Sequence, residues 1–193
     1  MGVSTLGEDA LGGRLSPEYV DHVSIDKGDV APDFELPDQH GTPRRLSTLL
    51  ADGPVVLFFY PAAMTSGCTA EACNFRDLGA EYTAAGAQRV GISHDKVDKQ
   101  RQFAELHGFD YPLLSDPENS AAEAYGIKRR LPLGPLSVKR VTFVIDTDRT
   151  VLDVIHSERD MNEHADRALD VVKARPARYR VRARCATCGR CGR

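Results

Sequence analysis

The chain has 193 residues, of which 41% are hydrophobic and 27% are charged, and its formal net charge is −3. This composition is typical of one globular domain with short extensions, and no apolar stretch approaches the roughly 20 residues that a membrane-spanning helix needs. The first residues lack the cationic start and apolar core of a secretory signal, so we expect a cytoplasmic protein.

Charge is distributed unevenly along the chain. From Arg175 onward there are seven arginines and no acidic residue, which leaves a net charge of −10 on the remainder. An acidic body gives no support for nucleic-acid binding by the fold itself. We expect a mobile extension over residues 1–27 with a short helix near Pro17–His22, an ordered domain over 28–174, and a basic tail over 175–193.

The first half of the ordered domain alternates between strand and helix patterns. We predict a half-buried strand at Ala31–Leu36, a turn at Asp38–Thr42, a short helix at Leu46–Leu50, a central strand at Val55–Tyr60, a helix running from Cys68 past Tyr82, a strand at Arg89–Ser93 and a helix at Lys96–His107 that ends at Gly108. Val55–Tyr60 is apolar on both faces, which suits a strand buried on both sides.

The second half adds a hairpin and a last helix. We predict a short strand at Tyr111–Leu114, a helix capped by Asp116 with Pro117 as its first residue, an apolar turn-rich loop at Leu131–Leu136, strands at Val141–Ile145 and Val151–Ile155, and a helix at Asn162–Lys173 with Ala165, Leu169 and Val172 inward. Alternating strands and helices indicate an α/β fold built on a βαβ unit.

The cysteine at position 68 lies in a context that favours reactivity. The strand Val55–Tyr60 is followed by the loop Pro61–Gly67, and Cys68 then falls in the first turn of the next helix. The first N–H groups of a helix lack intrahelical partners and carry the positive end of the helix dipole, so they stabilise a thiolate. A small buried core residue is the alternative interpretation, which this context makes much less attractive.

Several separated segments resemble the peroxiredoxins, in the branch of the bacterioferritin comigratory protein (Q-type). They are Ala31–Phe34, Phe59–Pro61, Thr65-x-x-Cys68-Thr69-x-Glu71-Ala72-Cys73, Gly91–Ser93, Leu114–Asp116 and Arg140-x-Thr142-Phe143-x-Ile145-Asp146. The resemblance extends over about residues 28–174. It implies a thioredoxin-like fold with a central mixed β-sheet flanked by helices.

The resemblance also implies roles for individual residues. Cys68 would be the peroxidatic cysteine, Thr65 would bind peroxide through its hydroxyl, Pro61 would shield the thiolate, and Arg140 would stabilise it, with Glu71 and Tyr60 in support. Each has a plainer alternative: Thr65 as a helix cap, Pro61 as a strand terminator, Glu71 as a first-turn acid, and Arg140 as a solvated residue at a strand end. Arg140 and Lys139 look alike at this strand end, and only the Arg140-x-Thr142-Phe143 context favours Arg140.

Cys73 would be the resolving cysteine by the same resemblance, with a core role as the alternative. Two residues five apart on one helix have Cα atoms about 8–9 Å apart, whereas a disulfide tolerates about 4.4–6.8 Å. A bond between Cys68 and Cys73 therefore requires the first turns of the helix to unwind. One departure from the family pattern is Ser66, where the usual proline would rigidify the loop.

The tail carries Cys185, Cys188 and Cys191 at C-x-x-C-x-x-C spacing. A structural zinc or an iron–sulfur cluster needs a fourth ligand, so these cysteines are weak metal candidates. Incidental thiols on a disordered basic tail are the favoured interpretation. A spare resolving thiol, a docking segment for a reductant and a metal site remain alternatives.

We therefore expect a thiol-dependent peroxidase that reduces hydrogen peroxide and organic hydroperoxides without a cofactor. Thioredoxin or a similar dithiol protein would recycle it, and the chain would be a monomer or weak homodimer without nucleic-acid or membrane partners. The rival functions are a disulfide reductase that uses Cys68 and Cys73 as its dithiol, and a metal-binding or interaction protein that acts through the tail.

Overall fold

The computed structural model describes residues 24–133, 136–157 and 160–175. A five-stranded mixed sheet in the order β5-β4-β3-β8-β9 forms its centre. Strands β3 (Val55–Phe59), β4 (Gln88–Ser93) and β5 (Leu113–Ser115) pair in parallel. Strand β8 (Val141–Ile145) pairs antiparallel with β3 on one side and with β9 (Val151–His156) on the other. The predicted α/β fold with a central mixed sheet is confirmed.

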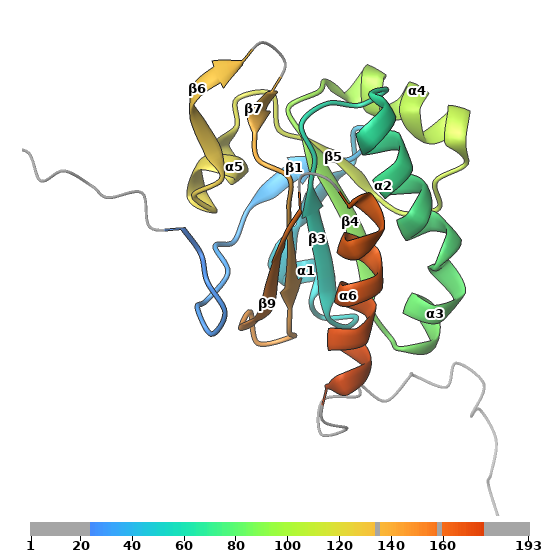
Figure 1. The fold of residues 1–193 in the computed structure, drawn as a ribbon, viewed down its shortest axis with the longest axis vertical. Helices are drawn as coiled ribbons and strands as arrows, with labels where there is room; N and C mark the ends of the chain where they lie inside the picture. Colours follow the sequence, from blue (N-terminus) through green and yellow to red (C-terminus); the bar gives the residue numbers. More distant parts are fainter. Residues whose placement is uncertain (1–23, 134–135, 158–159, 176–193) are drawn as a thin grey trace, which may run out of the picture.

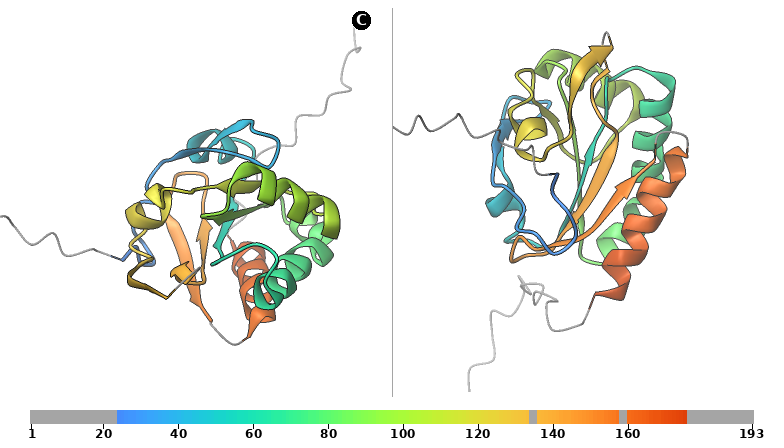
Figure 2. Two further views of the ribbon diagram at one scale, coloured as in Figure 1. Left: turned by 90° about the horizontal axis from the view of Figure 1, so that it is seen from above. Right: turned by 60° about the vertical axis from the view of Figure 1, so that its left-hand side comes forward.

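Helices cover both faces of the sheet (Figures 1 and 2). One face carries α2 (Ser66–Asp77), α3 (Gly79–Ala84), α4 (Val97–His107) and α6 (Met161–Ala174). The other carries α1 (Leu46–Leu49), α5 (Ser120–Ala124) and the small sheet of β1 (Glu35–Pro37) and β2 (Pro43–Arg45).

Strand β3 separates two hydrophobic cores. Val55, Leu57 and Phe59 pack into the core beneath α1 and α5, while Val56 and Phe58 pack into the core beneath α2, α4 and α6. All five side chains are buried, because alternate residues of a strand face opposite sides of the sheet. The prediction of a central strand buried on both faces is confirmed.

The long helix predicted after Cys68 is two helices. Leu78 leaves the helical conformation with φ −86° and ψ 15°, and α3 begins at Gly79. The buried guanidinium of Arg89 donates to the carbonyl of Phe75, and a Cβ on Gly79 would lie 2.9 Å from its Nη1. A side chain inserted into the ladder of helical hydrogen bonds breaks the helix at this point.

The prediction that the next helix begins at Pro117 is also wrong. Helix α5 starts at Ser120, after a turn in which Asn119 N–H donates to the carbonyl of Asp116. The Asp116 carboxylate still accepts hydrogen bonds from the backbone N–H groups of Ser120, Ala121 and Ala122. The acidic residue thus caps the helix from outside it, and Pro117 lies in the preceding turn.

The segment expected to be a loop at Leu131–Leu136 falls largely in two strands. β6 (Lys128–Leu133) pairs with β7 (Leu136–Val138) in an antiparallel two-stranded sheet with an irregular register. A proline is tolerated in such a ribbon because its missing N–H can face outward. The ribbon leads directly into Arg140, the residue before β8.

The other predicted elements agree with the structure to within a few residues. The strand at Ala31–Leu36 is shortened to β1, whereas Gly108 ends α4 in the left-handed conformation with φ 65°, as expected. Within the described part of the chain, no helix has both the length and the apolar character needed to cross a membrane. The proposed extension up to residue 23 and the tail from residue 176, with its three cysteines, lie outside the described residues.

Candidate active site

Cys68 lies in the first turn of α2, after the loop that follows β3. Its side chain is 1% exposed and packs in the core between the sheet and α2, α4 and α6. Thr65 occupies the N-cap position with extended backbone angles, and the N–H of Thr69 donates to its carbonyl. The helix therefore directs its unpaired N-terminal N–H groups toward the region of the buried thiol.

Arg140 reaches Cys68 from a distant part of the chain. Its Nη2 lies 3.3 Å from Cys68 Sγ, and its Nη1 donates to Glu71, which is on the same helix as Cys68. Arg140 is 7% exposed and Glu71 is fully buried. The structure thus brings three of the predicted site residues into one contiguous hydrogen-bonded group.

The charge of Arg140 is secured by its surroundings. Burial lowers the pKa of Arg140, but the negative charges of Glu71 and Cys68 and their hydrogen bonds outweigh that effect and raise it above the ordinary value. The guanidinium is therefore charged at every physiological pH. Its Nε is buried and has no hydrogen-bond acceptor among the described residues.

Thr65 does not act as a side-chain cap. Its hydroxyl donates to the carbonyl of Ala62 at 3.0 Å and makes no capping bond to α2. Thr65 is exposed at the end of the loop, and its hydroxyl oxygen can still accept a hydrogen bond. Pro61 is buried at the start of this loop, and the exposed Ser66 is the first residue of the helix.

Tyr60 is buried in the core, where its hydroxyl bonds to α4. Its hydroxyl donates to Gln100 Oε1 at 2.5 Å, and Gln100 in turn donates to Ser93 Oγ and to the carbonyl of Leu114. Burial raises the pKa of Tyr60 well above its usual range, so the phenol remains protonated. Tyr60 thereby connects the end of β3 with α4 and the ends of β4 and β5.

Asp95 holds the loop that precedes Cys68, and the sequence analysis did not identify it. The N–H of Ala63 donates to Asp95 Oδ2 at 2.6 Å, and the same carboxylate accepts from Ser93 and Lys99. Immediately beyond this anchor, Met64 has a left-handed backbone with φ 69° and is 40% exposed. The four-residue spacing between Asp95 and Lys99 was the available sequence signal, but it does not reveal the partner loop.

His164 is a second residue that the sequence analysis left unassigned. It is fully buried on α6, with Nδ1 2.9 Å from Thr142 Oγ1 and 3.7 Å from Glu71 Oε1, and Nε2 2.8 Å from the carbonyl of Ser157. Its position beside the inward-facing Ala165 was a usable signal. The neighbouring Glu71–Arg140 pair could not be anticipated from helical spacing.

Cys73 lies in the same helix as Cys68, and both thiols are free. Cys73 is partly exposed, whereas Cys68 is buried. Near Cys73 the helix is tied to its surroundings, because Tyr111 donates to the carbonyl of Ala72 at 2.7 Å and Asn74 donates to the carbonyl of Asn162 at 3.2 Å. The helical separation of the two cysteines excludes a disulfide in this conformation.

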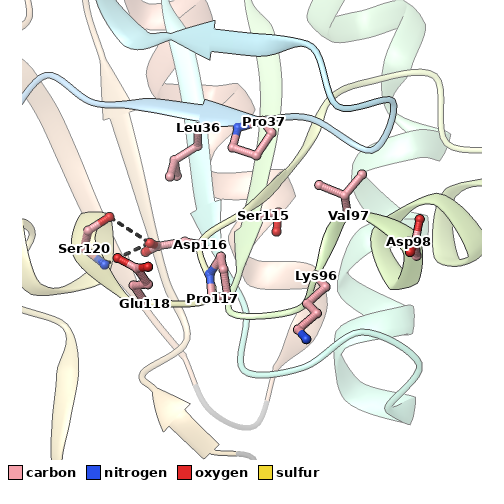
Figure 3. Close-up of a pocket in the computed structure, with 10 residues that line it drawn as sticks. All are labelled: Leu36, Pro37, Lys96, Val97, Asp98, Ser115, Asp116, Pro117, Glu118 and Ser120. Atoms are coloured by element: carbon pink, nitrogen blue, oxygen red, sulfur yellow. Dashed lines mark hydrogen bonds between the residues drawn. The ribbon is translucent and has the colours of Figure 1, made fainter.

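A separate cavity of about 450 Å³ lies between β1 and the segments that follow β4 and β5 (Figure 3). It is lined by Leu36, Pro37, Lys96, Val97, Asp98, Ser115, Asp116, Pro117, Glu118 and Ser120. None of the predicted site residues lines it. Among the described residues, no group of three or more His, Cys, Asp or Glu side chains could hold a metal ion.

Comparisons with known proteins agree on one family. The model of the AhpC/TSA family matches residues 27–154. A protein named as a peroxiredoxin of Mycobacterium tuberculosis is 64% identical over 147 residues, which cover 76% of this chain and 96% of the relative. Peroxiredoxin Bcp of Escherichia coli is 37% identical over 140 residues, which cover 71% and 89%.

Solved structures give the same result. The crystal structure of peroxidoxin BcpB from Mycobacterium tuberculosis has a TM-score of 0.74 and 63% identity, covering 78% of this chain and 97% of that one. A structure of the Xanthomonas campestris bacterioferritin comigratory protein, titled for its alkyl peroxide reduction activity, has a TM-score of 0.67 and 29% identity over 73% and 90% of the two chains. The chain therefore belongs to the AhpC/TSA family and, within it, to the peroxiredoxins.

Proposed function

We propose that Cys68 is the peroxidatic cysteine of this thiol-dependent peroxidase. The observation that carries the proposal is the 3.3 Å contact between Arg140 Nη2 and Cys68 Sγ at a buried helix N-terminus. A cationic donor and the helix dipole both favour the thiolate, which is the nucleophilic form of cysteine. We propose hydrogen peroxide and organic hydroperoxides as substrates, which is consistent with the alkyl peroxide activity named for the Xanthomonas relative.

In the proposed first step, the Cys68 thiolate attacks one peroxide oxygen and the O–O bond breaks. Cys68 becomes a sulfenic acid, and the other oxygen leaves as hydroxide or alkoxide and takes up a proton. Arg140 would stabilise the negative charge as it moves from sulfur to the leaving oxygen, while the Thr65 hydroxyl would accept a hydrogen bond from the peroxide. Pro61 would limit the access of water to the thiolate.

In the proposed second step, Cys73 attacks the sulfenic sulfur, a disulfide forms and water leaves. Because both cysteines lie on α2, the turns that carry Cys68 must unwind before the sulfur atoms can meet. Thioredoxin or a similar dithiol protein would then reduce the disulfide and become oxidised itself. We further propose that the protein works in the cytoplasm, as a monomer or weak homodimer and without a cofactor.

Oxidation by one equivalent of hydrogen peroxide, followed by intact mass measurement and mapping of the cysteines, tests both steps. The wild-type protein should lose two hydrogens and contain a disulfide between Cys68 and Cys73. Cys73→Ser should instead gain one oxygen atom at Cys68, and Cys68→Ser should consume almost no peroxide. Near-normal peroxide consumption by Cys68→Ser would refute the assignment of Cys68.

Experiments on the same proteins distinguish the rival functions. A disulfide reductase would need a disulfide substrate before its thiols are consumed, whereas a peroxidase loses thiols with peroxide alone. A function in metal binding through Cys185, Cys188 and Cys191 would appear as bound metal in protein purified without chelator. It would also leave peroxide reduction intact after substitution of those three cysteines.

A further inference from the structure

His164 occupies a position that the proposed peroxide mechanism does not use. Its ring is fully buried beneath the sheet, and it touches the far side of the group formed by Glu71, Arg140 and Cys68. Nδ1 lies 3.7 Å from Glu71 Oε1, on the opposite carboxylate oxygen from the one that binds Arg140. A titratable ring therefore borders the residue that orients the active-site arginine.

The partners of the ring define its tautomer. The carbonyl of Ser157, 2.8 Å from Nε2, can only accept a hydrogen bond, so Nε2 carries the hydrogen. In a neutral ring Nδ1 then has a lone pair, which accepts from the Thr142 hydroxyl at 2.9 Å. Both nitrogens are satisfied without any hydrogen bond to Glu71.

The surroundings favour this neutral form. Burial is the largest cause that lowers the pKa of His164, and the nearby charges of Arg140 and His156 act in the same direction. The carbonyl of Ser157 and the charge of Glu163 oppose them without reversing the shift. Glu71 faces the ring from α2 and would attract a proton placed on Nδ1.

A proton on Nδ1 would change how Glu71 is shared. Neutral His164 turns a lone pair toward Thr142 and offers Glu71 no donor, so the carboxylate remains directed at Arg140. A protonated ring would present an N–H between Thr142 Oγ1 and Glu71 Oε1, and the charged carboxylate is the stronger acceptor. Glu71 would then interact with both Arg140 and protonated His164, and its hydrogen bond to Arg140 would weaken.

We propose that neutral His164 is a positioning residue for the peroxide reaction, which keeps Glu71 on Arg140 and thereby keeps Arg140 at Cys68, and that protonation of Nδ1 releases this arrangement. The inference rests on the proposed role of Cys68. It makes the peroxide reaction depend on two protons: one that must be absent from Cys68 and one that must be absent from His164.

The test uses the full-length chain with its other four cysteines replaced by serine, so that Cys68 is the single thiol. The second-order rate constant for oxidation of Cys68 by hydrogen peroxide is measured from about pH 5 to about pH 9 in this parent and in His164→Gln. A glutamine amide can donate to Ser157 and accept from Thr142, but it does not titrate. His40→Gln is the matched control, since His40 is exposed in the turn after β1.

As the pH is lowered, the rate constant of the parent should fall with the slope expected for two protonations. That of His164→Gln should fall with the slope expected for one. His40→Gln should follow the parent. His164→Leu cannot be protonated and offers Glu71 no donor, so its rate constant should also fall with a one-proton slope on the acid side. Thr142→Val keeps the histidine and removes the donor to Nδ1, so the second protonation should move to higher pH.

Thr142→Val also keeps the inference testable if the His164 variants fold poorly. Parallel one-proton profiles in the parent, His164→Gln and Thr142→Val, with changes only in melting temperature, would overturn the positioning role. A parent in which Cys68 does not react with peroxide would instead overturn the proposed function.

Discussion

Arg140 Nη2 lies 3.3 Å from Cys68 Sγ, although the two residues are 72 positions apart in the chain. The contact is possible because β8, which follows Arg140 directly, pairs with β3, which leads into the loop before Cys68. In this pairing Val141 lies opposite Phe59, so the start of one strand and the end of the other meet at one edge of the sheet. The sheet register therefore places the guanidinium at the thiol.

Replacement of Arg140 by lysine should slow the peroxide reaction despite conservation of charge. Lysine lacks the planar group that binds Glu71 and Cys68 through separate nitrogens. We expect a loss of about 1–3 kcal/mol, or roughly fivefold to 160-fold in the second-order rate constant for oxidation of Cys68. Lys139→Arg is the control, since Lys139 is exposed. Equal rate constants for Arg140→Lys and wild type would show that the arginine does not act on the reaction.

Replacement of Cys73 by serine should permit one rapid oxidation of Cys68 but impair recycling by thioredoxin. Without a resolving thiol, sulfenic acid should accumulate at Cys68 and proceed to the sulfinic form at higher peroxide concentrations. Mass spectrometry of the oxidised protein measures both products. The matched control replaces Cys185, Cys188 and Cys191 by serine, and it should retain normal turnover. Normal turnover in Cys73→Ser with impaired turnover in the triple variant would show that a tail cysteine is the resolving thiol.

Replacement of Asp95 by alanine should destabilise the protein and slow the peroxide reaction together. The substitution removes the acceptor for Ala63 N–H and leaves buried donors without a partner, which costs about 1–3 kcal/mol. It also releases the loop that carries Thr65. Asp98→Ala is the control, because that carboxylate is 84% exposed. Denaturant unfolding and stopped-flow kinetics should both separate the two variants, and a purely structural Asp95 would alter only unfolding.

Two truncations that differ by one residue should behave differently. Arg175 ends the described chain with its Nε 3.4 Å from Asp146 Oδ1, and both side chains are less than 10% exposed. Removal of residues 176–193 keeps this pair and should leave the melting temperature and peroxide kinetics nearly unchanged. Removal of residues 175–193 takes away the arginine that pairs with the buried Asp146 carboxylate and should cost about 1–3 kcal/mol of unfolding free energy. If removal of residues 176–193 alone greatly slowed the oxidation of Cys68 by peroxide, the tail would belong to the active site.

His164 should also affect stability at acid pH. Because its pKa is lowered in the folded state, the unfolded chain binds this proton more readily, and the unfolding free energy should decline as pH falls below about 6.5. The contribution is lost progressively as pH decreases and is fully present above that value. Unfolding of wild type and His164→Gln at several pH values measures it, and the variant should show a shallower decline. Parallel curves would show that the ring does not titrate differently in the two states.

The sequence was sufficient for features that depend on neighbouring residues. The apolar run Val55–Tyr60 predicts a strand buried on both faces, and helical spacing predicts the inward side of α6, because periodic burial is a local property of each element. The position of Cys68 at a helix start follows from the same reasoning. Local signals failed where a distant side chain intervened, as when Arg89 divides the helix after Cys68 at Leu78.

Only the tertiary structure decided which residues surround the thiol. The family motif selected Arg140 over Lys139, but only the structure shows that one is buried against Cys68 and Glu71 while the other faces solvent. Asp95 and His164 carry no local signal of their partners, which come from another loop and another helix. Burial makes each such group costly unless a partner is supplied, and the partners are brought together by strand order and register, which no stretch of sequence encodes by itself.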